Sequence, residues 1–234
     1  MSYREHPPPP ALAPWLACTW ERRGAGDAPV RVLPDGCIDV VWTEGRATQV
    51  VGANTTAFLV ALPAGMRVAG ARLRPGAAPA LLGVDAEAVR DERVPVAVML
   101  GDRGARLAAA LDEGPDPVAG LRAGLLAWAA RAAPPDPLVR AAVARLARPD
   151  ALVGRLAGEL GVSERQLRRR VVAAVGYGPK RLARVLRLGR ALTAARAGDE
   201  LAHAAIEAGY ADQAHFANEC RALAGVPPSL VLVP

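Results

Sequence analysis

Aromatic residues, histidine, lysine and cysteine are all scarce in this chain of 234 residues. Aromatics make up 4% of the sequence, Lys180 is the sole lysine among 29 basic residues, and there are three histidines and three cysteines. The apolar fraction of 52% is inflated by alanine. This bias is typical of a GC-rich coding sequence, so a single alanine or arginine carries little information.

The cysteines and histidines are too few and too dispersed for a metal centre. Cys18, Cys37 and Cys220 show no CxxC spacing, which excludes a disulfide framework, a structural zinc site and a zinc-dependent repair protein for alkylated DNA. His6 is the one histidine before residue 200, whereas a cupin-type metalloenzyme needs a His/Glu cluster on its strands. We therefore expect no metal, no cofactor and no enzymatic activity.

Long apolar segments are absent as well. No run approaches 18 apolar residues, and the N-terminal stretch MSYREHPPPP lacks an apolar signal segment. These absences predict a soluble, cytoplasmic protein. The length allows two modest domains, each with a core of its own.

Charge is distributed unevenly along the chain. Residues 1–150 carry 17 basic and 16 acidic side chains, whereas residues 151–234 carry 12 and 7. Between residues 163 and 190 nine basic residues accompany one acidic residue, Glu164. A basic block of this kind indicates a polyanionic partner such as nucleic acid.

Residues 156–176, LAGELGVSERQLRRRVVAAVG, predict two helices joined by a short turn. Gly161 stands where the first helix must stop. Ser163, with Gln166 three residues later, has the spacing of a capping box at the start of the second helix. The segment therefore predicts a helix-turn-helix motif.

The second of these helices has an apolar face and a basic face. The apolar face is predicted to hold Leu167, Val171 and Ala174, at i, i+4 and i+7. Arg165, Arg168 and Arg169 project from another side of the helix. Such a helix has the chemistry to enter a DNA major groove, where arginine pairs bidentately with guanine. The alternative is an ordinary solvated charged face.

The same arrangement is repeated further along the chain. A helix over 179–197 is followed by a second helical pair, 201–208 and 212–223, with a break at Gly209 and Asp212 as a candidate N-cap. A helix of that length spans about 28 Å. Two recognition helices held apart by it could meet successive major grooves, about 34 Å apart.

The N-terminal half predicts an α+β arrangement. Residues 31–33, 34–36 and 37–43 indicate strand, turn and strand, and further short strands are expected at 48–51, 56–62 and 66–73. This pattern is typical of a small β-barrel or sandwich, with a cupin-like barrel as one form of it. Helices are then expected at 103–111, 118–132 and 138–147, with a proline-rich linker or hinge at 134–137. The predicted domains are 1–133, a linker with the first helix at 134–149, and an all-α domain at 150–230 with two helix-turn-helix motifs joined by a long helix.

The C-terminal third resembles the DNA-binding domain of the AraC/XylS family of transcriptional regulators. The resemblance rests on LAGELGVSERQLRRRVVAAVGYGPKRLARVLRLGRAL followed by LAHAAIEAGYADQAHFANECRALAGVPPSL. The N-terminal segments PPPPALAPWLACTWERR, VLPDGCIDVVW and ARLRPGAAPALLG look like a poorly characterised domain often attached to such regulators in actinobacteria. The resemblance implies a sequence-specific transcription regulator that binds promoter DNA and works with RNA polymerase.

The resemblance also implies which residues contact DNA. Bases would be read by the first recognition helix through Arg165, Arg168 and Arg169, and by the second through Gln213, Ala214, His215 and Asn218. Because Ala214 has no hydrogen-bonding group and Asn218 stands where arginine is common, the second helix should discriminate bases less strongly. Phosphate contacts are expected from Ser163, Arg170, Lys180, Arg181, Arg184 and Arg187.

The N-terminal domain is expected to sense an unidentified small molecule and is where a homodimer could form. The candidate effector-binding residues are Cys37, Asp39, Trp42, Arg72 and Arg74. For each of them a buried structural role or a solvated position is the alternative. A thiol-based redox sensor that uses Cys37 and Cys18 is the alternative function.

Overall fold

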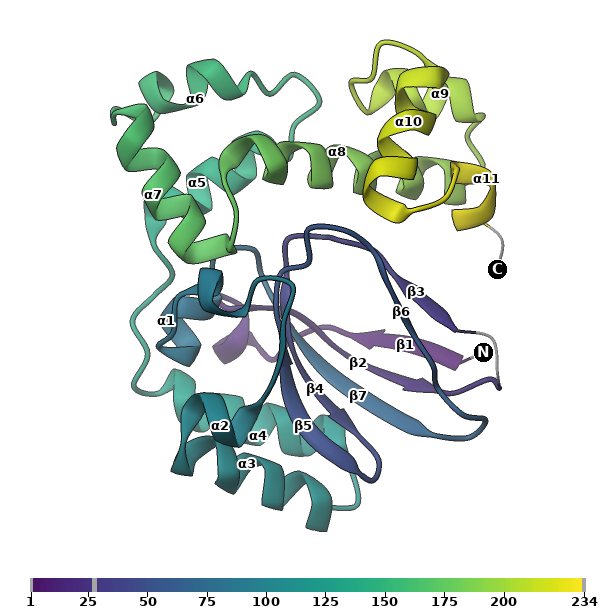
Figure 1. Ribbon diagram of the computed structural model, residues 1–234. Coiled ribbons are helices and arrows are strands. Elements are labelled where there is room, and N and C mark those ends of the chain that lie inside the picture. The colour runs from purple at the N-terminus through teal and green to yellow at the C-terminus, as the bar shows by residue number, and fades with distance from the viewer. Residues whose placement is uncertain (1, 27–28, 233–234) are drawn as a thin grey trace.

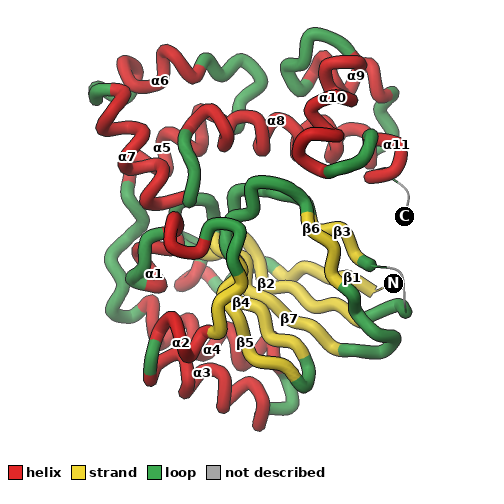
Figure 2. The backbone as a smooth tube through the Cα atoms, viewed as in Figure 1, coloured by secondary structure: helices red, strands yellow, loops and turns green. Residues whose placement is uncertain are grey.

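The computed structural model describes residues 2–26 and 29–232. The chain forms two halves, one built on a β-sheet with helices on one side and the other built of helices alone (Figures 1 and 2). This is the α+β class that the sequence predicts, with the all-α half at the C-terminal end.

The sheet half contains an open antiparallel sheet and a separate pair of short strands. The six strands of the main sheet lie in the order β1-β2-β7-β4-β5-β8, so β1 and β8 form its edges. Their bounds are β1 Ser2–His6, β2 Leu16–Arg23, β4 Ile38–Thr43, β5 Arg46–Val51, β7 Arg67–Leu73 and β8 Arg93–Pro95. The second sheet pairs β3, Val30–Val32, with β6, Phe58–Val60. Within the described ranges the main sheet is not closed into a barrel.

The expected strand, turn and strand at 31–43 are present as β3, the turn at 34–36 and β4. The two strands do not pair with each other, however, as they would in a hairpin. The reason is that β4 already has β5 on one side and β7 on the other, so it has no free edge. The strand β3 therefore leaves the sheet and pairs with β6 above it.

Alternation along β4 orients the two faces of the main sheet. Ile38, Val40 and Trp42 are buried on the face that the helices cover, and Asp39 lies on the other face. The covering helices are α1 Ala78–Leu82, α2 Val96–Leu100, α3 Asp102–Glu113 and α4 Pro117–Ala129, with 3₁₀ turns η1 at Pro10–Leu12 and η2 at Ala86–Val89. Trp42 Nε1 donates a hydrogen bond to Asp112 Oδ1 at 2.9 Å, which ties β4 to α3.

The C-terminal half contains two helix-turn-helix motifs on either end of one long helix (Figure 1). Its helices are α5 Pro137–Leu146, α6 Val153–Glu159, α7 Glu164–Val175, α8 Pro179–Arg196, α9 Leu201–Glu207, α10 Gln213–Ala224 and α11 Pro228–Val231. The first motif is α6–α7, the second is α9–α10, and α8 joins them. Each predicted helix of this half is present within a few residues of its expected bounds.

The first motif and the sheet half share one hydrophobic core. Leu73 of β7 and Leu82 of α1 belong to the same buried cluster as Val139 of α5 and as Leu167 and Val171 of α7. The second motif has a separate cluster, which includes Leu188, Leu192, Phe216, Cys220 and Leu223. The two motifs are therefore attached to the sheet half in different ways.

The proline-rich segment at 134–137, which we expected as a linker or hinge, is held in place. Trp15 Nε1 donates to the carbonyl oxygen of Ala133 at 3.2 Å. Asp136 caps α5, because its Oδ1 accepts from the N–H groups of Leu138 and Val139. The same carboxylate binds the Arg170 guanidinium of α7 through two hydrogen bonds of 2.7 and 2.6 Å.

None of the helices in residues 2–26 and 29–232 is long and apolar enough to cross a membrane.

Two substitutions separate the two roles of Asp136. We expect Asp136→Ala to lower the free energy of unfolding by about 1–3 kcal/mol, because it removes both the N-cap and the partner of Arg170. Asp136→Asn keeps the cap and should cost under about 1 kcal/mol, since both partners of the ion pair are partly exposed to solvent. Urea denaturation measures both values. Equal losses in the two variants would show that the cap contributes nothing.

The ion pair also predicts a pH dependence. Partial burial acts to raise the pKa of Asp136, but hydrogen bonds from Arg170, Leu138 and Val139 hold that pKa below its usual range. A carboxyl group with a lowered folded-state pKa stabilises the fold above its unfolded-state pKa, and this contribution is lost as the pH falls through the lowered value. The difference in unfolding free energy between the parent and Asp136→Ala should therefore begin to shrink as the pH falls below about 4. Once the pH is below the lowered pKa, only the contribution of the uncharged cap should remain.

Candidate nucleic-acid interface

The start of α7 and the turn before it have the structure that the sequence predicts. Ser163 Oγ accepts a hydrogen bond from the N–H of Gln166 at 3.2 Å, and Gln166 Oε1 accepts from the N–H of Ser163 at 3.0 Å, which together form the capping box. Gly161 has a φ of +67°, a left-handed conformation that glycine adopts without steric cost. Leu167 and Val171 are buried and fix which side of α7 faces inward.

The outer face of α7 carries three free arginines. Arg165, Arg168 and Arg169 are all exposed. Across residues 2–26 and 29–232, none of the three makes a hydrogen bond or an ion pair with another side chain or with the backbone. These guanidinium groups are therefore available to an external partner.

The six residues expected at phosphate are in different surroundings. The Ser163 hydroxyl caps α7, and Arg170 binds Asp136. Arg181 Nη1 donates to the carbonyl oxygen of Thr55 in the sheet half at 2.9 Å, and Arg184 binds Glu219 of α10 through two hydrogen bonds of 2.9 Å.

The other two members of this set differ from each other. The Arg187 guanidinium lies over the Tyr210 ring, 5.4 Å from its centroid. Lys180 is exposed in the first turn of α8, and its ammonium group has no partner within the described ranges. Most of the basic side chains of α8 thus serve internal contacts, and within the described ranges Lys180 in its first turn and Arg196 in its last turn have no partner.

The helix α10 has a capped N-terminus and an exposed first turn. Asp212 Oδ1 accepts from the N–H of His215 at 2.6 Å, and Phe216 is fully buried. The predicted base-contacting residues Gln213, Ala214, His215 and Asn218 are exposed. His215 Nδ1 accepts a hydrogen bond of 3.4 Å from the N–H of Ala211, which leaves its Nε2 outward.

Arg190 was not anticipated from the sequence and has a structural role. Its Nη1 donates to the carbonyl oxygen of Ala147 at 2.7 Å and its Nη2 to that of Ala208 at 3.1 Å. These carbonyls lie at the C-terminal ends of α5 and α9, where helix acceptors lack partners of their own. A single guanidinium thus ties two supporting helices to α8.

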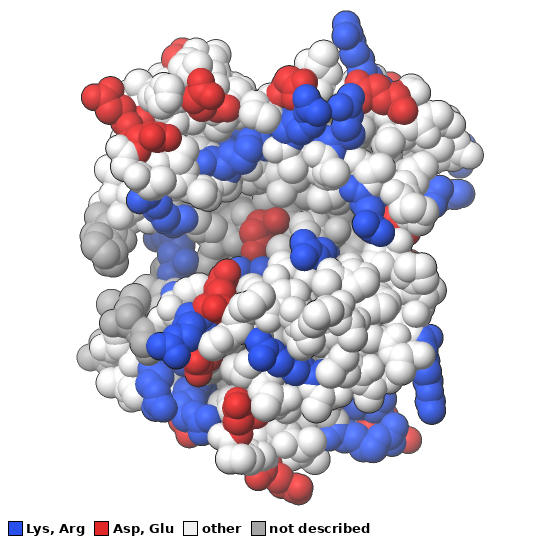
Figure 3. Space-filling view, turned by 180° about the vertical axis from the view of Figure 1, so that it is seen from behind, with Lys and Arg blue, Asp and Glu red and all other residues white. Residues whose placement is uncertain are grey.

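Seen from behind, basic side chains stand among acidic ones along the helical half (Figure 3). The same view shows a hollow between the two halves, left of centre. On this side of the molecule there is no broad surface of one charge, so the back of the helical half is not where we expect the DNA.

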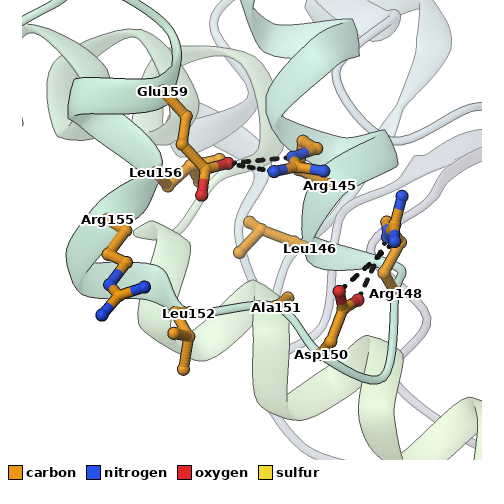
Figure 4. A pocket seen from close by; sticks show the side chains of 9 residues that line it. All are labelled: Arg145, Leu146, Arg148, Asp150, Ala151, Leu152, Arg155, Leu156 and Glu159. Carbon is orange, nitrogen blue, oxygen red and sulfur yellow. Dashed lines mark hydrogen bonds and ion pairs between the residues drawn. The ribbon is translucent and has the colours of Figure 1, made fainter.

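A small pocket between the end of α5 and α6 also contains arginines (Figure 4). Its volume is about 180 Å³. Arg145 binds Glu159 and Arg148 binds Asp150, so these cations are neutralised by carboxylates within the pocket. Arg155 points away from these pairs (Figure 4). The pocket therefore offers little to an anionic ligand.

The predicted effector residues Asp39 and Arg72 bind each other on the face of the sheet opposite the helices, which the strand pair β3–β6 packs against. Arg72 Nε lies 3.4 Å from Asp39 Oδ1, and Trp20 Nε1 donates to Asp39 Oδ2 at 3.0 Å. Arg72 also lies within 3.4 Å of Asp35 and Glu5. Burial raises the pKa of Asp39 to about 6, although Arg72 and Trp20 act to lower it.

The remaining effector candidates do not join this cluster as a set. Cys37 is next to it, Trp42 lies on the opposite face of the sheet, and Arg74 lies outside. Arg74 borders a groove of about 780 Å³ between the sheet half and α5. Its lining residues are Ala13, Pro14, Ala17, Arg74, Pro75, Ala77, Pro135, Pro137, Arg140, Ala141, Val143 and Ala144.

The cysteines do not have the surroundings of reactive thiols. Burial raises the pKa of Cys18 to about 11 and that of Cys37 well above its usual value. Both groups are therefore protonated near neutral pH, whereas a redox-sensing cysteine needs a thiolate.

Among residues 2–26 and 29–232, no three His, Cys, Asp or Glu side chains come together as a metal site.

Comparisons with known proteins match the two halves separately. A family described as a helix-turn-helix domain matches residues 156–232, and a domain of unknown function, DUF6597, matches residues 4–95. No curated protein matches the chain significantly.

One similar solved structure is the C-terminal domain of AraT, a response regulator from Geobacillus stearothermophilus. It is 22% identical to this chain, with a TM-score of 0.38. The match covers 42% of this chain and 84% of that one. Two structures of ToxT from Vibrio cholerae are each 10% identical, with TM-scores of 0.46 and 0.42; both cover 99% of this chain, and 95% and 98% of their own. At these TM-scores the likeness in shape adds no argument.

The sequence motifs, the two helix-turn-helix units and the matched family agree on the same residues. Residues 156–232 match a helix-turn-helix family and form two helix-turn-helix units, which supports a DNA-binding role in transcription regulation and agrees with the resemblance to the AraC/XylS family.

Proposed function

We propose that the chain reads promoter DNA through the outer faces of α7 and α10. The observation that carries the proposal is the free arginine face of α7. Arg165, Arg168 and Arg169 are exposed and unpaired within the described ranges, on a helix whose opposite face is fully buried. Arginine on such a helix can pair bidentately with guanine in the major groove.

The second recognition helix offers fewer strong donors. Gln213 and Asn218 carry amides, His215 has one ring nitrogen outward, and Ala214 provides only a methyl group. An alanine contributes an apolar contact with a thymine methyl group rather than a hydrogen bond. The proposal is therefore that α7 supplies most of the base discrimination and α10 a weaker part.

Phosphate contact is proposed for Lys180 and no longer for Arg170, Arg181 or Arg184. Lys180 is exposed and free, whereas the other three bind groups of the protein itself. Contact with RNA polymerase and a homodimer through the sheet half are implied by the family resemblance and stay predictions.

The response to a small molecule is a further part of the proposal. The groove of about 780 Å³ supports it, because its walls come from the sheet half and from α5, and Arg74 and Arg140 lie at its rim. Such a groove fits a small apolar molecule with an acidic group. A compound that bound there would bias how α5 sits against the sheet half.

Paired substitutions in α7 test base reading. We expect Arg168→Ala to leave stability within about 0.5 kcal/mol, since the side chain is exposed, and to cost about 1–3 kcal/mol in specific binding with relaxed preference at one guanine position. Leu167→Ala should instead cost about 2–5 kcal/mol of stability through a core cavity. Binding to an operator selected from genomic fragments, together with thermal unfolding, measures both.

The matched control is Arg46→Ala, which removes an exposed arginine in the sheet half. This variant should leave the base preference unchanged. Its affinity for DNA should fall only by the small long-range effect of removing one distant positive charge. If Arg165→Ala, Arg168→Ala and Arg169→Ala all bound the selected operator as tightly and selectively as the parent, α7 would not read bases.

Lys180 and Arg184 should behave in opposite ways. Lys180→Ala should leave the unfolding temperature unchanged and lower the slope of log K against log salt by about one unit, because one phosphate contact is lost. Arg184→Ala leaves the mostly buried Glu219 without its partner and should cost about 1–2 kcal/mol of stability. A reduced salt slope in correctly folded Arg184→Ala would instead place Arg184 at phosphate.

A thermal-shift screen of small carboxylic acids tests the groove. Compounds that raise the unfolding temperature of the parent should lose that effect in Arg74→Ala and in Arg140→Ala, since each variant removes one cation from the rim. They should keep it in Arg46→Ala. Stabilisation that survives both rim substitutions would mean that the compounds bind elsewhere.

A further inference from the structure

The position of the second motif depends on few contacts with the rest of the chain. The first motif is packed into the core of the sheet half through Leu167, Val171 and Val175. The second motif has its own cluster around Phe216 and Leu223, which packs on the second part of α8. Its position relative to the sheet half therefore depends on α8, on the Arg184–Glu219 ion pair between α8 and α10, and on individual contacts with the sheet half.

The second motif makes hydrogen bonds with the sheet half at the C-terminal end of α10. Arg31 Nη1, from β3, donates to the carbonyl oxygen of Ala224 at 2.8 Å. The N–H of Ala57, next to β6, donates to the carbonyl oxygen of Leu223 at 2.7 Å. The last carbonyls of a helix lack intrahelical partners and carry partial negative charge, so a guanidinium group there is favourable.

These contacts come from one pair of strands. The strands β3 and β6 pair with each other, with Arg31 opposite Leu59. Leu33, just beyond β3, packs against the second motif's cluster. Arg31 is thus the one side chain in the described ranges that joins the sheet half to α10 by a hydrogen bond.

The long helix α8 runs from the first core into the second. Val185 belongs to the first core, whereas Leu188 and Leu192 belong to the second. Gly189 is exposed within the stretch that belongs to the second core, and a Cβ atom added to it would meet nothing within 4 Å. A glycine inside a helix costs about 0.5–1 kcal/mol relative to alanine and gives the backbone more freedom. No neighbouring atom requires a glycine at this position.

We propose that Arg31 is a positioning residue that fixes the C-terminal end of α10 to the sheet half and so limits bending of α8, and that it thereby sets the separation of the two DNA half-sites. The inference rests on the proposed reading of DNA by α7 and α10. Successive half-sites of a helical turn lie about 34–36 Å and 10–10.5 base pairs apart, so one base pair more or less shifts a half-site by about 3.4 Å and rotates it by about 34°. A modest swing of the second motif would accommodate such a change.

Operators of altered spacing test this function of Arg31. The starting point is the operator that the full-length parent selects, with one base pair inserted or deleted between its half-sites. We expect the parent to lose roughly tenfold in affinity or more on either change, and Arg31→Ala to lose roughly threefold or less. Mismatches inside each half-site should cost the same in both proteins, because the base-reading residues are untouched.

Three further variants sharpen the test. Arg31→Lys keeps a cationic donor and should recover part of the spacing preference. Gly189→Ala, added to Arg31→Ala, stiffens α8 and should recover part of it as well. Arg46→Ala, the exposed control in the sheet half, should behave like the parent. If Arg31→Ala bound every spacing more weakly by one common factor, or showed the parent's preference, the positioning role would be refuted.

A measurement without DNA separates this inference from the proposed function. Nitroxide labels on Glu164→Cys and Gln213→Cys report the distance between the first turns of α7 and α10, in a Cys37→Ser background because Cys18 and Cys220 are buried. The distance distribution should be narrow with Arg31 and broad with Arg31→Ala. Equal widths would overturn the positioning role. If the parent protein selected no operator, the proposed DNA reading would be overturned. The widths of the distance distributions would then still test the positioning role of Arg31.

Discussion

The hydrophobic core shared by the sheet half and the first helix-turn-helix motif determines the rest of the structure. Leu73 and Leu82 of the sheet half lie in one cluster with Leu167 and Val171 of α7. Burial of the inner face of α7 in this cluster forces its arginines outward, so the same apolar contacts that stabilise the fold also present the candidate base-reading groups. The recognition helix is therefore part of the main core rather than of a loosely tethered domain.

Local features of the fold could be predicted because the information lies within one or two helical turns. Ser163 and Gln166 form the predicted capping box, Gly161 makes the predicted left-handed turn, and Leu167 and Val171 are buried as their spacing requires. The exposed arginines of α7 follow from the same periodicity. In these segments, the chain neighbours of a residue are also the atoms that determine its conformation.

Pairings between distant segments could not be predicted in the same way. The strand β3 pairs with β6 because β4 has both edges occupied, and that depends on β7, which comes later in the chain. Arg170 and Arg184 lie in a basic block that indicates a polyanion, yet each binds a carboxylate about 35 residues away, Asp136 and Glu219. Net charge records how many cations a segment has but not which of them the fold neutralises.

The arginines of this chain thus have different roles that composition does not distinguish: some bind carboxylates, some bind backbone carbonyls, and some are free. One group donates to backbone carbonyls where segments meet: Arg181 to Thr55, Arg190 to Ala147 and Ala208, and Arg31 to Ala224. A planar guanidinium with five N–H donors can satisfy several acceptors at once, which an ammonium group on a flexible stem does less well. In a protein with a single lysine, such contacts connect helices to each other and to the sheet half. Other arginines, such as Arg46, are also free, but Arg165, Arg168 and Arg169 are free together on the outer face of a helix in the first helix-turn-helix motif. That combination makes them the stronger candidates for DNA.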